Sequence, residues 1–244
     1  QNPELSLMEF KTAKRLATEL RTVGFTVTEN VGGTGIVALM KNGEGPTVMV
    51  RADMDGLPVV EASGLTNAST VITKDWNGKE VGVMHACGHD VHITSLVGTA
   101  RHMASIKSQW SGTLMLIGQP AEEMGPGASA MMADNLWQRF GKPDYAFAFH
   151  VGSGIEAGKI VVDEGSPYAG ADTVDIIVHG IGAHGAYPHR GKDPIVIGAQ
   201  IVNNLQTIIS RELAPRYPGV ITVGSFHAGT KHNIISDRAH LQLT

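Results

Sequence analysis

The sequence predicts an α/β protein, with a largely parallel sheet that carries helices on both faces, followed by a smaller α+β unit. The first observation behind this fold class is that short apolar strands alternate with segments of helical spacing up to about residue 150. The second is that the order changes to strand, helix, strand and strand in the last third of the chain. Of the 244 residues, 42% are hydrophobic, which is enough to bury a sizeable core.

Local patterns predict the elements of the first domain. Ser6-Leu7-Met8-Glu9 has the form of a capping box, so the first helix is expected to begin there and to end near Thr22, before Gly24. Apolar runs predict strands, the first two joined by a Gly-rich turn, and apolar residues three and four apart predict helices. In chain order we expect strands at 25–29, 36–40 and 47–51, a helix at 92–106, a strand at 113–117, a helix at 128–140 and a strand at 145–149.

The second domain is expected to follow a loop that contains Gly165-Ser166-Pro167. Its expected elements are a strand at 173–178, a helix at 194–211 and strands at 219–226 and 239–243. We therefore assign residues 1–168 to the first domain and 169–244 to the second. Both ends look truncated, because residue 1 is Gln rather than Met and the chain stops within an alternating, strand-like pattern.

Composition excludes several classes of function. The net charge is −4 and no basic stripe is visible, which argues against a nucleic-acid partner. No apolar stretch approaches the roughly 18 residues that a membrane span needs. A single cysteine rules out an internal disulfide framework.

Polar residues follow three of the expected strands in the first domain. They are the run Arg51–Asp55, the pair Glu122-Glu123, and His150. Because ligands of open α/β sheets bind outside the carboxyl ends of the strands, we expect these side chains to converge. Cys87 and His89 precede a helix, whose dipole would favour a thiolate at Cys87.

This set of residues points to a metal site. Cys, His and Glu suit zinc and its first-row neighbours, and Asp53 or Asp90 could fix the tautomer of a ligating imidazole. Of Glu122 and Glu123, one can bind the metal while the other serves as general base. Taken singly, each residue also has an ordinary structural explanation: Cys87 as a small buried hydrophobe, His150 as a core histidine, and the two glutamates as a solvated helix N-terminus.

Four motifs in this order resemble one known family. They are Arg51-Ala-Asp-Met-Asp55, His85-Ala-Cys-Gly-His-Asp90, Gln119-Pro-Ala-Glu-Glu123 and Phe149-His-Val151. Together they are similar to the amidohydrolase branch of the aminoacylase/carboxypeptidase metallopeptidase family. That branch includes N-acyl-L-amino acid amidohydrolases, hippurate hydrolases and plant hydrolases of auxin–amino acid conjugates.

The resemblance implies a dinuclear metal site. Cys87, His89, Glu123 and His150 would be the ligands of two divalent cations, with Glu122 as general base. Zinc, manganese, cobalt and nickel all remain open, because such a donor set accepts several of these metals. The family's fifth ligand is a histidine near the C-terminus of a longer chain, so we expect it beyond residue 244 and expect these 244 residues alone to be inactive.

The second domain carries a further part of the resemblance. Gly180-Ile-Gly-Ala-His184-Gly-Ala-Tyr-Pro-His189 is similar to the start of the family's ferredoxin-like lid or dimerisation domain. The resemblance implies that His184 helps to stabilise the tetrahedral oxyanion, that Asn233 approaches the substrate, and that the protein is a homodimer formed through this domain.

The function that we expect is metal-dependent hydrolysis of the amide bond of an N-acyl amino acid or a small peptide-like conjugate. A metallo-carboxypeptidase or dipeptidase of the same family is the nearest alternative. A thiol hydrolase with Cys87 as nucleophile and His89 or His150 as base is a second, but it leaves Glu122-Glu123 without a role. A piece that only binds metal or dimerises is the third.

Overall fold

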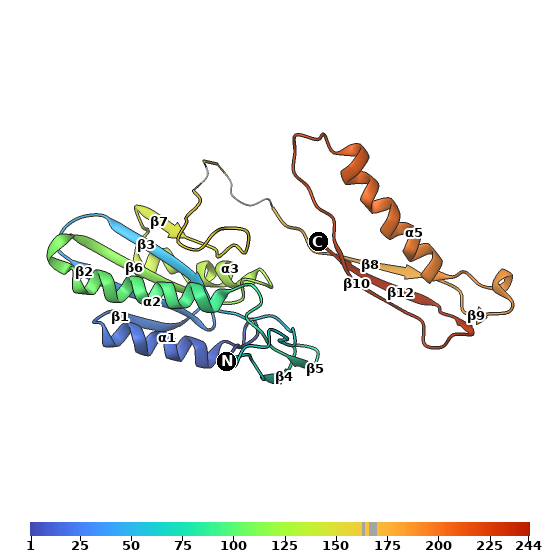
Figure 1. The fold of residues 1–244 in the computed structure, drawn as a ribbon, viewed down its shortest axis with the longest axis horizontal. Helices are drawn as coiled ribbons and strands as arrows, with labels where there is room; N and C mark the ends of the chain where they lie inside the picture. Colours follow the sequence, from blue (N-terminus) through green and yellow to red (C-terminus); the bar gives the residue numbers. More distant parts are fainter. Residues whose placement is uncertain (163, 166–169) are drawn as a thin grey trace. The chain divides into compact units, whose positions relative to one another are not determined.

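The computed structural model describes residues 1–162, 164–165 and 170–244, and they divide into two compact units. Unit 1 is Gln1–Ala157 and unit 2 is Gly158–Thr244 (Figure 1). The expected loop at Gly165-Ser166-Pro167 and the expected boundary at 168/169 lie largely outside the described residues. Each unit is described by itself.

Unit 1 is built on a five-stranded mixed sheet in the order β1-β2-β6-β3-β7. The pairs β1–β2 and β2–β6 are antiparallel, whereas β3–β6 and β3–β7 are parallel. The prediction of a largely parallel sheet is therefore wrong. The short turn at Gly32 and Gly33, both at positive φ, makes β1 and β2 antiparallel, and β2 is also antiparallel to β6, its neighbour from far along the chain. The strands are β1 (Thr26–Val31), β2 (Gly35–Asn42), β3 (Thr47–Asp53), β6 (Gly112–Gln119) and β7 (Tyr145–Ala148).

Helices cover both faces of this sheet, because successive side chains of β2 lie in two different hydrophobic clusters. Ile36, Ala38 and Met40 lie in one hydrophobic cluster with residues of α1 (Phe10–Thr22) and α2 (His89–Ser105). Val37 lies in a second cluster, with α3 (Pro126–Ala133) and α4 (Leu136–Phe140). Because successive strand side chains point to opposite faces, one strand contributes to both cores. The sheet is thus a rigid central layer between two helical layers (Figure 1).

The expected capping box at the start of α1 is wrong. Glu4 takes the capping role: its carboxylate accepts the N–H groups of Lys11 and Thr12 at 3.2 and 2.8 Å. The side chains of Ser6 and Glu9 instead form hydrogen bonds with distant parts of unit 1. A capping box is a local pattern, and here tertiary partners compete for the same groups.

Two further segments differ from expectation. The single helix expected at 128–140 is two helices, because Asn135 adopts a left-handed conformation at φ 59° between them. The polar stretch 61–80 contains β4 (Ile72–Lys74) and leads into β5 (Glu80–Gly82), which pair as a hairpin. A 3₁₀ turn at Lys107–Gln109 precedes β6.

Unit 2 is a three-stranded antiparallel sheet with a helix packed on it. The order is β10-β12-β8, and α5 contributes Ile201 and Val202 to the core around Leu241. Asp193 caps α5 by accepting the N–H of Ile195. The elements are β8 (Val174–His179), β9 (Ala183–His184), a 3₁₀ turn (Pro188–Arg190), α5 (Pro194–Thr207), a π-helical turn (Ile208–Glu212), β10 (Val223–Ala228), β11 (Ile234–Ile235) and β12 (Arg238–Leu243).

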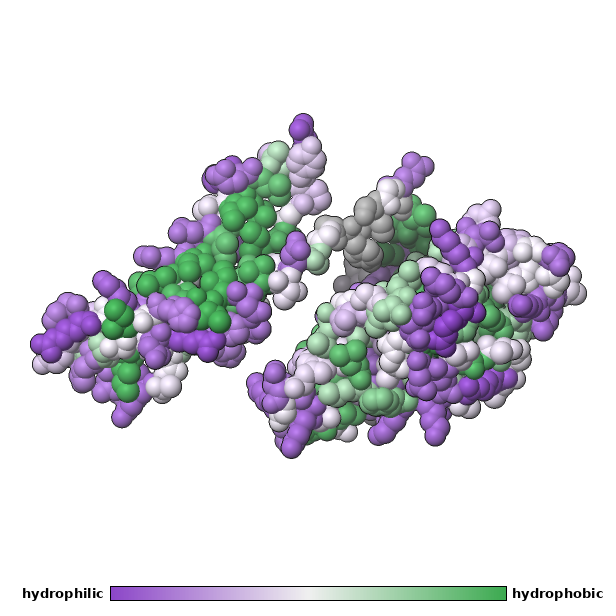
Figure 2. Space-filling view, turned by 180° about the vertical axis from the view of Figure 1, so that it is seen from behind, coloured by the Kyte–Doolittle hydropathy of each residue, from purple (hydrophilic) through white to green (hydrophobic). Residues whose placement is uncertain are grey.

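The surface of unit 2 includes a large apolar area. Figure 2 shows hydrophobic residues gathered on the displayed face of this unit, bordered by hydrophilic ones. Large apolar side chains such as Ile195, Val196 and Ile208 are 41%, 54% and 44% exposed. Contiguous apolar surface of this kind is typical of interaction sites. Separately, no helix among the described residues is long and apolar enough to cross a membrane.

Candidate metal centre

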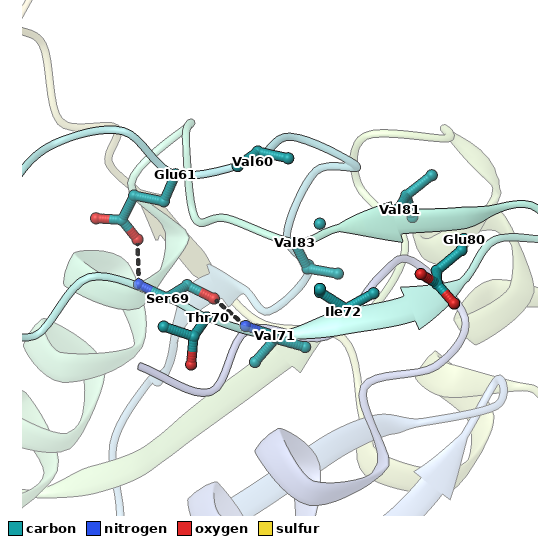
Figure 3. Close-up of a pocket in the computed structure, with 10 residues that line it drawn as sticks. Val60, Glu61, Ser69, Thr70, Val71, Ile72, Glu80, Val81 and Val83 are labelled. Atoms are coloured by element: carbon teal, nitrogen blue, oxygen red, sulfur yellow. Dashed lines mark hydrogen bonds between the residues drawn. The ribbon is translucent and has the colours of Figure 1, made fainter.

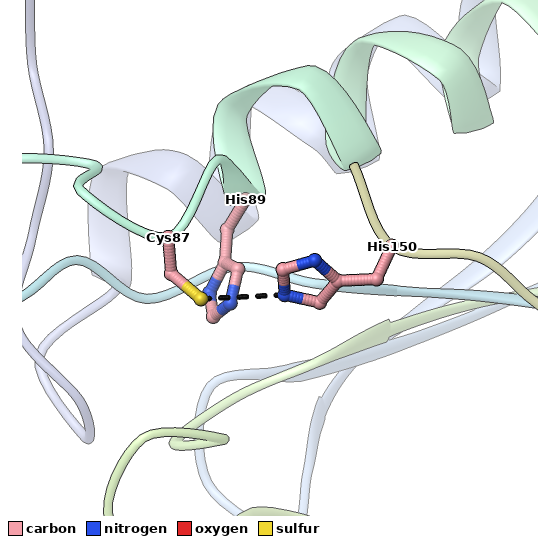
Figure 4. A group of neighbouring side chains, drawn as sticks. All are labelled: Cys87, His89 and His150. Atoms are coloured by element: carbon pink, nitrogen blue, oxygen red, sulfur yellow. Dashed lines mark hydrogen bonds between the residues drawn. The ribbon is translucent and has the colours of Figure 1, made fainter. Parts of the chain in front are cut away.

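The ends of several elements bring metal-binding side chains together in unit 1. Cys87 and His89 lie at the N-terminal end of α2, Glu122 and Glu123 follow β6, and His150 follows β7. Strands β3, β6 and β7 run parallel to one another, so their carboxyl ends meet at one edge. Figure 4 shows Cys87, His89 and His150 pointing toward one another.

The donor atoms of the expected ligands form two groups that share His89, and a third group joins His89 to Asp53 and His92. Those of Cys87, His89 and His150 all lie within 4.8 Å of one another, as do those of His89, Glu122 and Glu123. The Cys87 Sγ is 3.3 Å from His150 Nε2, and His89 Nε2 is 3.8 Å from Glu123 Oε1 and 3.9 Å from Glu122 Oε2. His89 Nε2 therefore lies within reach of donors from both groups, so a cation bound there would have thiol, imidazole and carboxylate ligands close by.

Two of these atoms are buried without a hydrogen-bond partner among the described residues. They are His89 Nε2 and Glu123 Oε1. Leaving a buried polar atom unsatisfied costs roughly 1–3 kcal/mol, so such atoms in a folded protein call for an explanation. A divalent cation held by both atoms would provide that explanation, and the donor set of thiol, imidazole and carboxylate fits zinc and its first-row neighbours.

Asp55 orients the ring of His89, a role that the sequence analysis missed. Its Oδ1 lies 3.1 Å from His89 Nδ1, so the ring donates there and keeps Nε2 free to bind a metal. Its Oδ2 accepts the Ser6 hydroxyl at 2.5 Å and the Glu123 N–H at 3.0 Å. Burial raises the pKa of Asp55, but these hydrogen bonds outweigh burial and lower it overall. The sequence signal for this role is the place of Asp55 in the Arg51–Asp55 motif, which it shares with Asp53.

Asp53 supports a different histidine. Its Oδ1 is 2.6 Å from His92 Nδ1, and Arg51 pairs with its Oδ2 at 2.6 Å. His92 Nε2 in turn accepts the N–H of Val151 at 3.0 Å and so holds the backbone beside His150. Asp53 Oδ2 is also 3.7 Å from His89 Nε2.

Asp90, the other carboxylate expected to fix an imidazole, is exposed in the first turn of α2. An acidic side chain in that position is stabilised by the positive end of the helix dipole. The carboxylate that contacts the His89 ring is that of Asp55.

The expectation of a thiolate at Cys87 is wrong for the metal-free protein. Burial and the neighbouring carboxylates, first Glu123 and then Glu122 and Asp53, raise the pKa of Cys87 to about 12. The helix dipole is too weak to offset several nearby negative charges. Burial and Glu122 likewise raise the pKa of Glu123. Clustered carboxylates of this kind favour a cation among them.

His184 and Asn233 lie together in unit 2. Strands β9 and β11 pair His184 with Ile234, and the Gly185 N–H donates to the carbonyl of Asn233 at 2.8 Å. The Nδ1 of His184 accepts the Ala186 N–H at 3.1 Å, so in the neutral ring Nε2 carries the proton. His184 could therefore donate a hydrogen bond from Nε2.

A separate hollow of about 470 Å³ lies beside the β4–β5 hairpin (Figure 3). Its ten lining residues are mainly aliphatic, including Val60, Val71 and Val81, with the carboxylates of Glu61 and Glu80. None of the ten is a histidine or a cysteine. The chemistry-bearing site of unit 1 is therefore the cluster around His89.

Comparison with known proteins identifies a family for this chain. The model of Peptidase family M20/M25/M40 matches residues 49–239. Thermostable carboxypeptidase 2 of Saccharolobus solfataricus is 41% identical over 248 residues, covering 100% of this chain and 60% of that protein. Hippurate hydrolase of Campylobacter jejuni is 38% identical, covering 100% of this chain and 61% of that protein.

A solved structure of Bacillus subtilis YXEP, a dinuclear metal-binding peptidase of the M20 family, is 30% identical with a TM-score of 0.65. The match covers 99% of this chain and 59% of that one. The chain thus spans about 60% of the length of the curated relatives that it matches. On the extent of the family match and the identity to these relatives, the chain belongs to peptidase family M20/M25/M40.

Proposed function

We propose that the protein is a metal-dependent amidohydrolase that cleaves the amide bond of N-acyl amino acids or small peptide-like conjugates. The observation that carries the proposal is the pair of donor groups sharing His89, with two buried donor atoms that lack partners among the described residues. Relatives named hippurate hydrolase, N-acetyldiaminopimelate deacetylase and IAA-amino acid hydrolase support the substrate class.

Cys87, His89, Glu123 and His150 would hold two divalent cations, with zinc, manganese, cobalt and nickel all compatible with the donors. Bound cations would supply the Lewis acidity that makes water nucleophilic near neutral pH. The Glu122 side chain is 39% exposed against 20% for Glu123, so Glu122 is the more accessible to water and substrate. It would take the proton of the attacking water and pass it to the leaving amine nitrogen.

Further roles are part of the same proposal. Residues 169–244, which lie within unit 2, would form a ferredoxin-like lid and dimerisation domain. Its exposed apolar side chains support a homodimer. His184 would stabilise the oxyanion through its Nε2–H, Asn233 would contact the substrate, and Asp53 would support the metal ligands.

The test combines metal content with activity. We expect mass spectrometry to find about two equivalents of transition metal in the purified protein and sharply less in Cys87→Ala, because the thiolate is one of the proposed ligands. A matched control is Thr94→Ala, an exposed change on the same helix. Glu122→Gln should keep the metal but lower the hydrolysis rate by about 10²–10⁴-fold, measured on the longest chain that the gene encodes.

The alternatives give different results. A wild-type protein without bound metal, together with no change in Cys87→Ala, would contradict the proposal. Inactivation by iodoacetamide with no loss in EDTA would support a thiol hydrolase. Release of C-terminal residues from unblocked peptides, with hippurate left intact, would support a carboxypeptidase. Tight metal binding without hydrolysis of any of these substrates would support a non-catalytic role.

A further inference from the structure

A buried carboxylate far from the metal donors in sequence contacts the backbone next to two of them. Glu9 is 0% exposed and is not a ligand in the proposed centre. Its Oε1 accepts the N–H of Ala121 at 2.7 Å and that of Leu7 at 3.0 Å, and its Oε2 accepts the hydroxyl of Thr34 at 2.6 Å. The contact with Ala121 spans 112 positions in the chain. Ala121 immediately precedes Glu122-Glu123.

The backbone that Glu9 holds is in an unusual conformation. Ala121 and Leu7 both have positive φ, 46° and 66°, which L-residues with a side chain rarely adopt. Such conformations persist only where surrounding contacts hold them in place. At Ala121 the carbonyl accepts the Gly127 N–H at 3.3 Å, while the N–H points to Glu9. The turn is therefore held by two hydrogen bonds of Ala121, one through its N–H and one through its carbonyl, and Glu9 accepts the first.

The direction of this turn decides where two proposed functional groups lie. After Ala121 the chain places Glu123 Oε1 3.8 Å and Glu122 Oε2 3.9 Å from His89 Nε2. A rotation at Ala121 would move both carboxylates relative to His89. A second contact from the same N-terminal segment, Ser6 to Asp55, supports His89 itself.

We propose that Glu9 is a positioning residue that fixes the Glu122-Glu123 pair through the N–H of Ala121. The proposal rests on the proposed function. Capping of α1 does not explain why a glutamate stands at position 9, because the Glu9 carboxylate makes no capping hydrogen bond to that helix. A glutamate there is explained by the need for a buried acceptor that reaches the N–H groups of Leu7 and Ala121, both in left-handed conformations. Displacements near 1 Å can cost about 100-fold in rate, so such an anchor matters for activity.

The test compares variants that differ only in what they offer Ala121. Glu9→Ala removes the acceptor, and Glu9→Asp shortens the side chain by one methylene, so both should release the turn. Glu9→Gln keeps an oxygen for the Ala121 N–H, and its amide can donate to the Thr34 hydroxyl. Thr34→Val is the matched control, because it removes the hydrogen bond to Oε2 and leaves Ala121 untouched.

Two readouts are used, and only one depends on the proposed function. Hydrogen exchange of the metal-free protein should show faster exchange across residues 119–125 in Glu9→Ala and Glu9→Asp, and wild-type rates in Glu9→Gln and Thr34→Val. Zinc affinity should fall about 10–100-fold in the first two variants and stay within about threefold in the other two. If Glu9→Ala does not fold, Glu9→Asp carries the comparison.

The outcomes separate the two claims. If wild type binds none of zinc, manganese, cobalt and nickel, the proposed function fails while the exchange result still decides whether Glu9 holds the turn. If Glu9→Ala and Glu9→Asp fold and show wild-type exchange and zinc affinity, Glu9 is not a positioning residue. If Thr34→Val weakens zinc binding as much as Glu9→Ala does, general destabilisation explains the effect, and the proposal is overturned.

Discussion

The two ring nitrogens of His89 have different partners, and this asymmetry matters more than the identity of the residue alone. Nδ1 faces Asp55 Oδ1 at 3.1 Å, whereas Nε2 is buried without a partner among the described residues. A neutral imidazole donates from one nitrogen and accepts at the other. Asp55 therefore selects the tautomer that leaves Nε2 able to bind a cation. The same carboxylate accepts the Glu123 N–H, so it connects two proposed ligands.

The residue-scale prediction is that Asp55→Asn weakens metal binding by about 10–100-fold. An asparagine can offer an oxygen to His89 only by turning its NH₂ group toward the N–H of Glu123, where two donors would meet. The measurement is a zinc titration of the metal-free protein. Asp90→Asn is the matched control and should change the affinity by less than about threefold, since Asp90 is exposed. Equal effects of the two changes would show that Asp55 has no special role.

At the scale of elements, the sequence located most strands and helices but did not determine how they pair. The apolar pattern that identified 36–40 and 113–117 is the same for parallel and antiparallel neighbours, so pairing direction had to come from connections. The Gly-rich turn after β1 held that information. Contacts distant in sequence accompany both the break at Asn135 and the lost capping box: Asp134 accepts the Gly32 N–H, and the Ser6 hydroxyl donates to Asp55.

One such distant contact gives a pH-dependent prediction. Asp134 precedes the left-handed Asn135, accepts the Gly32 N–H at 3.1 Å and pairs with Arg139. The hydrogen bond from Gly32, then that from Arg139, lowers the pKa of Asp134 below 3.8. A carboxyl with a lowered folded pKa stabilises the protein above its unfolded pKa, and this contribution is lost as the pH falls through the folded value.

The difference in urea midpoint between wild type and Asp134→Asn should therefore be present at pH 7. It should shrink as the pH falls below 3.8, where the unfolded carboxyl becomes protonated. Glu44→Gln, an exposed change in the turn before β3, is the control and should show little difference at either pH. A difference for Asp134→Asn that stays constant across this range would mean that the ion pair and the Gly32 contact do not contribute.

At the scale of the whole molecule, the metal donors that the sequence predicted in unit 1 come together because they follow one topological rule. Cys87, Glu123 and His150 each stand at the end of an element that meets the same sheet edge. The supporting contacts of Asp55 and Glu9 were not predictable in this way, because nothing in a linear sequence pairs Glu9 with Ala121. Motifs identify the groups that carry chemistry, whereas the residues that hold them in place become visible only in three dimensions.

The two units also have separate hydrophobic cores, which leads to a prediction about the whole chain. Leu116 is buried in the unit 1 core and Leu241 in that of unit 2, both 0% exposed. Each Leu→Ala change should lower the free energy of unfolding of its own unit by about 2–5 kcal/mol. Because the proposed metal ligands all lie in unit 1, added zinc should stabilise the unfolding transition of unit 1.

Calorimetry with and without zinc tests this. Leu241→Ala should lower the midpoint temperature of a transition that does not respond to zinc, and it should leave zinc affinity unchanged. Leu116→Ala should lower the midpoint temperature of the other transition, which zinc raises because it binds only the folded unit. A single transition that zinc and both substitutions shift together would contradict the prediction. It would mean that the two units unfold as one, in which case changes to the core of unit 2 would alter metal binding in unit 1 by mass action alone.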